Sequence, residues 1–230
     1  MNMYIVVEGK HTEINVYPAW LAFVAPKMTR IDNPRNVCSN NYYLISGEGI
    51  PSIYNHILHA VEDINEINKQ KNGLGFNYLV VGIDVEEESR EQIKDSIAGT
   101  LKDNNVTLDE NVKMILLEQK VCIESWFLGN RAVFKDNPQS KEFADLIKKY
   151  NVKNENPENM NNLDPQRFSN EAQFHLHYLK QMFKERHMNY GKNRTGEVCK
   201  ETYLEQLIKR YGETSHIQSF GRWLDFMSNL

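Results

Sequence analysis

The stretch that decides the fold class is FNYLVVGID, from Phe76 to Asp84. It is a nearly continuous apolar run, which is typical of a strand covered by helices on both faces, as in a parallel sheet. The turn signal KNGLG precedes it, and the acidic run DVEEES, which begins at Asp84, ends it. We therefore expect a buried strand that ends on a carboxylate.

Strand and helix patterns alternate around this run. Further apolar segments predict strands at residues 4–7, 41–46 and 112–119, and helical spacing of apolar residues predicts helices at residues 12–26, 50–67 and 89–104. This alternation predicts an α/β fold over residues 1–149, with an open, mainly parallel sheet flanked by helices.

The character of the chain changes after this region. Residues 150–169 are rich in Asn and Pro, and we expect them to form a linker or a mobile loop. Three helical patterns follow within residues 170–230, and they predict a helical C-terminal region packed on the sheet domain.

Composition limits the classes of protein that remain. The 230 residues include 40% hydrophobic side chains, enough for a substantial core, and the formal net charge of −4 argues against coating of nucleic acid by bulk charge. A local basic groove, and therefore a nuclease, stays possible. No window approaches the roughly 20 apolar residues of a membrane helix, and MNMYIVV lacks the features of a signal peptide. We expect a cytoplasmic protein that does not enter membranes.

Acidic residues stand where two predicted strands end. Glu8 closes YIVVE and Asp84 closes YLVVGID, and ligands of open parallel sheets bind beyond the carboxyl ends of the strands. Two carboxylates held at one edge repel unless a cation lies between them. Glu86 lies two residues after Asp84 and would point the same way in an extended segment. Such oxygen ligands suit Mg²⁺ or Mn²⁺.

A structural explanation competes with this one. Acidic residues are common where a strand ends and a helix begins, because they interact favourably with the helix dipole. Taken separately, Glu8 and Asp84 are more often structural than catalytic. Together at neighbouring strand ends they favour a metal site.

The order of these motifs resembles that of the Toprim superfamily, which includes topoisomerases, primases and OLD-family nucleases. In that family a Glu followed by Gly ends the first strand, and a DxD motif that binds Mg²⁺ ends a later strand. Glu8 with Gly9 and Asp84 with Glu86 match these motifs, with Glu in place of the second Asp. The resemblance implies a compact Toprim-like sheet and metal-dependent cleavage of DNA or RNA.

Three other segments are similar to small RloB-like Toprim proteins of bacterial phage defence. EGKHTEINVY resembles their EGxxTExxY opening, and CIESWFL resembles their E-W-L cluster, which makes Glu124 a further metal candidate. HMNYGKNRTG, with Lys192 as its cation, resembles their C-terminal region. Relatives often work beside an ATPase, and this chain has no GxxxxGK[ST] loop, so ATP dependence would need a partner protein.

These arguments define the predicted site. The predicted catalytic residues are Glu8, Asp84, Glu86 and Lys192. The predicted metal ligands are Glu8, Asp84, Glu86, Glu13 and Glu124. The residues predicted to contact phosphate or nucleic acid are Gly9, Lys10, His11, Lys192 and Arg194.

Alternatives remain for several of these residues. Glu13 is equally explained as an exposed Glu in a first helical turn, and Glu124 as a helix-start carboxylate that faces solvent. Three functions stay open: a metal-dependent nuclease, a binding module that docks on an ATPase or on nucleic acid without cutting, and a metal-dependent phosphohydrolase of small nucleotides.

Overall fold

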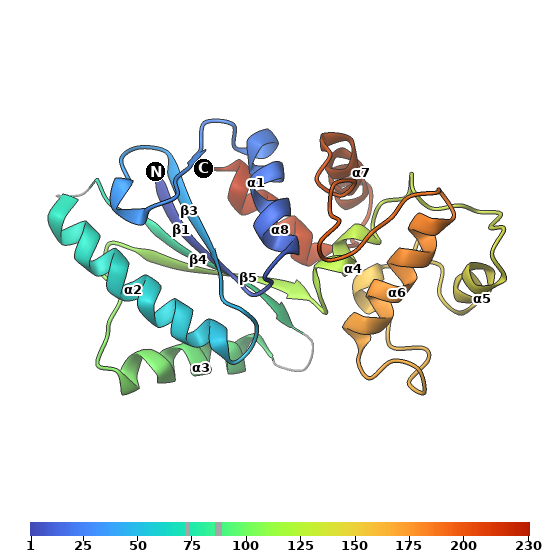
Figure 1. Cartoon of the computed structure of the whole chain (residues 1–230), viewed down its shortest axis with the longest axis horizontal. Coiled ribbons are helices and arrows are strands. Elements are labelled where there is room, and N and C mark those ends of the chain that lie inside the picture. Colours follow the sequence, from blue (N-terminus) through green and yellow to red (C-terminus); the bar gives the residue numbers. More distant parts are fainter. Residues whose placement is uncertain (72–73, 86–88) are drawn as a thin grey trace. The chain divides into compact units, whose positions relative to one another are not determined.

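The computed structural model describes residues 1–71, 74–85 and 89–230 (Figure 1). Within them the predicted α/β fold is confirmed as a five-stranded parallel sheet flanked by helices. The strands are β1 (Asn2–Val7), β2 (Thr29–Arg30), β3 (Asn41–Ser46), β4 (Tyr78–Val85) and β5 (Lys113–Lys120). The helices are α1 (Thr12–Val24), α2 (Ser52–Lys71), α3 (Arg90–Asp103), α4 (Ile123–Phe127), α5 (Lys141–Lys149), α6 (Glu171–Lys184), α7 (Glu201–Glu213) and α8 (Gln218–Ser228), with short 3₁₀ turns η1 (Pro34–Asn36) and η2 (Pro157–Asn159).

The chain divides into two compact units. The first comprises Met1–Ile83, Glu87–Glu118 and Met227–Leu230, and the second comprises Asp84–Glu86 and Gln119–Phe226. These bounds differ from the predicted division at residues 149 and 170. The difference arises because α4 and α5 pack against α6, so they join the helical unit rather than the sheet.

The sheet has the strand order β2-β3-β1-β4-β5. β1 pairs in parallel with β3 and with β4, with Val7 opposite Ser46 on one side and opposite Gly82 on the other. All six residues of β1 are buried, because helices cover both faces: α2 and α3 lie on one face and α1 on the other (Figure 1). β2 and β3 lie on one side of β1, and β4 and β5 lie on the other, so the strand order changes direction between β1 and β4. In sheets of this topology, ligands bind beyond the carboxyl ends of the strands at this point.

The flanking helices follow their sequence patterns. Ile53, Ile57, Val61 and Ile64 of α2 are fully buried, as their spacing predicts. α3 begins at a capping box, in which the hydroxyl of Ser89 accepts a hydrogen bond from the Gln92 backbone N–H at 3.2 Å and the Gln92 side chain accepts one from the Ser89 N–H at 2.7 Å. No helix in the described part of the chain combines the length and the apolar character needed to cross a membrane.

Residues 150–169 were expected to form a linker or mobile loop, but residues 150–160 pack within the second unit, whereas residues 161–169 hold no buried side chain. Val152 and Met160 are buried, and the carboxylate of Glu158 accepts hydrogen bonds from the backbone N–H groups of Gln218 and Ser219, both at 2.9 Å, at the start of α8. The asparagines of this segment make local turns, since their side chains accept hydrogen bonds from backbone N–H groups two residues on.

A buried histidine joins α6 to two other segments of the second unit. His175 is fully buried, with Nδ1 2.8 Å from the hydroxyl of Ser125 and Nε2 2.6 Å from the carbonyl oxygen of Met160. Burial lowers the pKa of His175 from 6.5 to about 4, although the hydrogen bond to the Met160 carbonyl opposes this shift. The imidazole is therefore neutral in the folded protein at neutral pH.

We expect this histidine to make the protein less stable in acid. Between pH 6.5 and about 4 the unfolded chain binds a proton at His175 that the folded chain does not, so the stabilisation present above pH 6.5 is lost as the pH falls through this window. The loss in the free energy of unfolding is on the order of 3 kcal/mol. Urea unfolding at a series of pH values measures it.

Two variants isolate the contribution of His175. His175→Gln should flatten the dependence of stability on pH in this window, whereas His59→Gln, at an exposed histidine on α2, should leave it unchanged. Equal pH dependence in wild type and His175→Gln would contradict the assignment.

Candidate functional site

A cavity in the second unit brings together three residues of the predicted site. It has a volume of about 210 Å³ and is lined by Asp84, Cys122, Glu124, Asn170, Ala172, Gln173, Leu176 and Lys192. Asp84, Glu124 and Lys192 come from β4, from α4 and from the chain before α7, respectively. The fold therefore places two carboxylates and one lysine around one small space, although these residues are far apart in the sequence.

Both carboxylates are positioned by the ends of regular elements. Asp84 is the penultimate residue of β4, and the backbone N–H of Val121 donates a hydrogen bond to the carbonyl oxygen of Val85 at 3.2 Å, which holds the start of α4 near this strand end. Glu124 lies in the first turn of α4 and is only 4% exposed. The alternative in which Glu124 faces solvent is therefore wrong.

The thiol of Cys122 lines the same cavity as the two carboxylates. Burial raises the pKa of this thiol well above its usual value, and the negative charges of Glu124 and Asp84 raise it further. Both carboxylates thus act on the same sulfur atom. Because the thiol stays protonated, Cys122 forms an inert wall of the cavity rather than a nucleophile.

Lys192 lies at the tip of a tight turn. The backbone N–H of Arg194 donates to the carbonyl oxygen of Gly191 at 2.7 Å, which closes the turn and leaves Lys192 exposed at the rim. Arg194, also predicted to contact nucleic acid, is exposed and is not among the described residues that line the cavity.

Two polar residues at the start of α6 also line the cavity, although they were not among the predicted site residues. Asn170 caps this helix, since its side chain accepts a hydrogen bond from the Gln173 backbone N–H at 3.0 Å, and both residues line the cavity. An Asn directly before a helical pattern is a known capping signal, so the cap could have been found. No signal in the sequence indicates that Asn170 lines the same cavity as Asp84.

The predicted residues of the β1–α1 loop lie in the first unit. The backbone N–H of Glu8 donates to the carbonyl oxygen of Gly82 at 2.9 Å, which extends the pairing of β1 with β4. Glu13 is 4% exposed, so its alternative as an exposed helix residue is wrong. Its carboxylate packs on Gly9, where a Cβ would lie 1.9 Å from Oε2 of Glu13, and this close approach explains the glycine.

The other predicted residues of this loop are exposed. Lys10 forms an ion pair with Glu48 at 3.6 Å, and His11 precedes the first residue of α1. Glu86 lies outside the described residues. Glu8 and Asp84 belong to different units, so the convergence of these two carboxylates stays a prediction.

The oxygen ligands that the described residues offer a divalent cation are few. Among residues 1–71, 74–85 and 89–230, no three His, Cys, Asp or Glu side chains are grouped so that they could hold a metal ion. Asp84 and Glu124 nevertheless line one cavity, and Mg²⁺ is commonly bound through one or two carboxylates, with water and substrate phosphate completing its coordination. Two carboxylates at one cavity would supply the protein ligands that such a cation needs.

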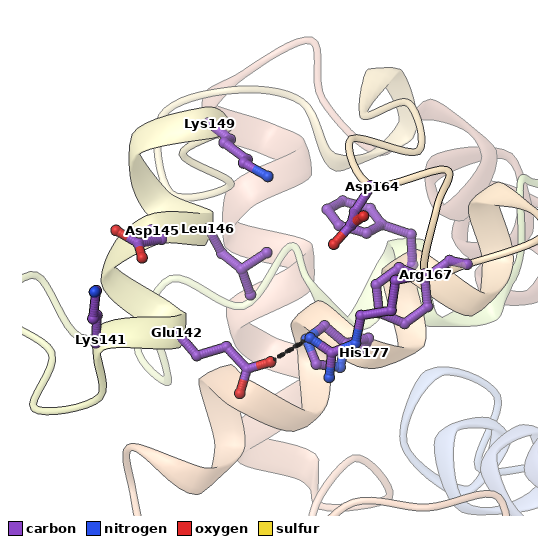
Figure 2. A pocket seen from close by; sticks show the side chains of 10 residues that line it. Lys141, Glu142, Asp145, Leu146, Lys149, Asp164, Arg167 and His177 are labelled. Carbon is purple, nitrogen blue, oxygen red and sulfur yellow. Dashed lines mark hydrogen bonds and ion pairs between the residues drawn. The ribbon is translucent and has the colours of Figure 1, made fainter.

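A second cavity, of about 330 Å³, lies between α5, the chain before α6 and α6 itself (Figure 2). The Oε1 atom of Glu142 accepts hydrogen bonds from Arg167 at 2.7 Å and from Nε2 of His177 at 3.1 Å. The hydrogen bond from Arg167 lowers the pKa of Glu142, and Asp145 pairs with Lys148 at 3.4 Å. These acids are already paired with cations, so we place the candidate metal site at Asp84 and Glu124.

The fold defines the class of protein: it is an α/β protein with a Rossmann-like parallel sheet and C-terminal helices. No protein-family model, curated protein or solved structure matches the chain. The functional argument accordingly rests on the residues around the cavity.

Proposed function

We propose that this protein is a Mg²⁺- or Mn²⁺-dependent nuclease that hydrolyses phosphodiester bonds of DNA or RNA. The observation that supports it best is the cavity in which Asp84, Glu124 and Lys192 meet. Two carboxylates and a lysine are the groups that such a reaction uses, because a phosphodiester is an anion whose charge increases in the transition state.

Each residue has a distinct role in this proposal. Asp84 and Glu124 would hold the cation through carboxylate oxygens. The bound cation would supply Lewis acidity and lower the pKa of a coordinated water. Lys192, on its closed turn, would bind a non-bridging phosphate oxygen and stabilise the developing negative charge. Glu8 and Glu86 remain further candidates for the same set.

The setting of this activity belongs to the proposal too. The Toprim-like motif order supports a role as an effector of bacterial phage defence, and the missing GxxxxGK[ST] loop supports an ATPase partner for any ATP-dependent step. A second candidate function is a metal-dependent phosphohydrolase of small nucleotides, which would use the same carboxylates and lysine without a nucleic-acid groove.

The proposal predicts cleavage that requires a divalent cation. The protein should be incubated with supercoiled plasmid, single-stranded DNA, RNA and free nucleotides in the presence of Mn²⁺. We expect cleavage of at least one polymer, its loss with excess EDTA and its return when Mn²⁺ is added in excess. Activity on nucleotides alone would favour the phosphohydrolase. Inactivity on every substrate would contradict both and favour a binding module.

A further inference from the structure

We propose that Tyr190 is a positioning residue that orients the carboxylate of Glu124 and sets the place of Lys192 at the same cavity. This inference rests on the proposed function, because it concerns the same metal and phosphate site. It assigns a role to a side chain that does not itself line the cavity.

Tyr190 contacts the carboxylate of Glu124 directly. The phenol of Tyr190 donates a hydrogen bond to Oε1 of Glu124 at 2.9 Å, and the two residues are 7% and 4% exposed. A buried carboxylate that accepts such a bond is restricted in its rotation, so its orientation toward the cavity is set before any ligand binds. Outer hydrogen bonds of this kind orient metal ligands and tune their affinity.

The ring of Tyr190 is itself held by its neighbours. Its ring packs against Phe127 of α4 and Phe183 of α6, with ring centroids 5.7 Å apart in both pairs. These contacts come from two different helices and leave the ring little freedom to move. The hydroxyl is therefore held at a fixed point beside Glu124.

Tyr190 lies only two residues before Lys192 in the chain. The turn that presents Lys192 is closed by the pairing of Gly191 with Arg194, and Thr195 on its far side is buried. Buried residues thus anchor both ends of a turn whose tip is exposed. Tyr190 therefore contacts Glu124 and also anchors one end of the turn that carries Lys192.

Tyr203 supplies a matched control in the same aromatic cluster. Its hydroxyl donates to the carbonyl oxygen of Phe127 at 2.7 Å, and its ring packs against Phe127 and Phe183 at 6.3 and 6.1 Å. Tyr190→Phe and Tyr203→Phe each remove one buried hydroxyl while keeping the ring. They differ in the acceptor that loses its donor, which is the carboxylate of Glu124 in one case and the backbone carbonyl of Phe127 in the other.

The test compares Mn²⁺ binding by wild type, Tyr190→Phe and Tyr203→Phe with titration calorimetry on the whole protein without nucleic acid. We expect Tyr190→Phe to weaken Mn²⁺ binding by about 10- to 100-fold and to lower kcat, and Tyr203→Phe to stay within about twofold of wild type. Both variants should lose a similar amount of thermal stability.

The outcomes separate this inference from the proposed function. If wild type binds Mn²⁺ and cleaves, but both variants match it or lose affinity equally, Tyr190 has a structural role and the inference is overturned. If wild type neither binds Mn²⁺ nor cleaves any substrate, the proposed function fails and the inference fails with it.

Discussion

Replacement of Asp84 by Asn should lower Mn²⁺-dependent cleavage by about 100- to 1000-fold while the protein stays folded. The substitution keeps the shape of the side chain and removes the charge that would hold the cation. Asp84 lines its cavity together with Glu124 and Lys192, so Mn²⁺ binding should weaken along with cleavage. Cleavage rates, Mn²⁺ affinity and thermal unfolding measured on the same preparation test all three points.

Asp145→Asn provides the control for this variant. Asp145 lines the other cavity, where it is paired with Lys148, and the chemical change is identical. We expect wild-type cleavage from it. Asp84→Asn with wild-type rates would exclude the proposed site, and Glu8→Gln in the same assay tests whether the first predicted carboxylate takes part.

Replacement of Arg210 by Met should destabilise the second unit by about 3–5 kcal/mol. Arg210 is 1% exposed, and its guanidinium donates to the carbonyl oxygens of Val152 at 2.6 Å and Glu155 at 2.7 Å, and lies 2.8 Å from Nδ1 of His216. Burial lowers the pKa of Arg210 to about 10, and the nearby charge of Arg131 adds to this shift. Met fills a similar volume but leaves buried acceptors without a donor.

Arg186→Met is the matched control, because Arg186 also donates to backbone carbonyls but is exposed. Its guanidinium contacts the carbonyl oxygens of Val133 at 3.0 Å and Phe134 at 2.7 Å. Water can replace these hydrogen bonds, so we expect a loss of about 1 kcal/mol or less. Urea unfolding followed by circular dichroism measures both variants, and equal losses would show that burial of Arg210 is not the cause.

The strands and long helices could be predicted because their signals are local. The apolar run of β4 and the spacing of Ile53, Ile57 and Val61 in α2 depend on residues within a few positions of each other. The short strand β2, two residues long, and the short helix α4 carry too few residues for a periodic pattern. The packing of residues 150–160 could not be predicted, because Asn-rich composition is shared by mobile loops and by packed turns.

The difference in that segment depends on a distant partner. Val152 and Glu155 are held by Arg210, which arrives from α7 more than fifty positions later in the chain. No pattern within residues 150–169 predicts the hydrogen bonds from Arg210. The same reasoning applies to Glu124, whose buried carboxylate accepts a hydrogen bond from Tyr190 in a different part of the chain.

By itself the sequence determined the α/β class and the presence of acidic residues at the ends of two of its strands, because these properties follow from the periodicity and the ends of single elements. The tertiary structure alone decided that Glu124 and Lys192 share a cavity with Asp84 and that Tyr190 donates a hydrogen bond to Glu124. Those neighbours come from segments far apart along the chain, and their meeting depends on how whole helices pack, which no local pattern encodes.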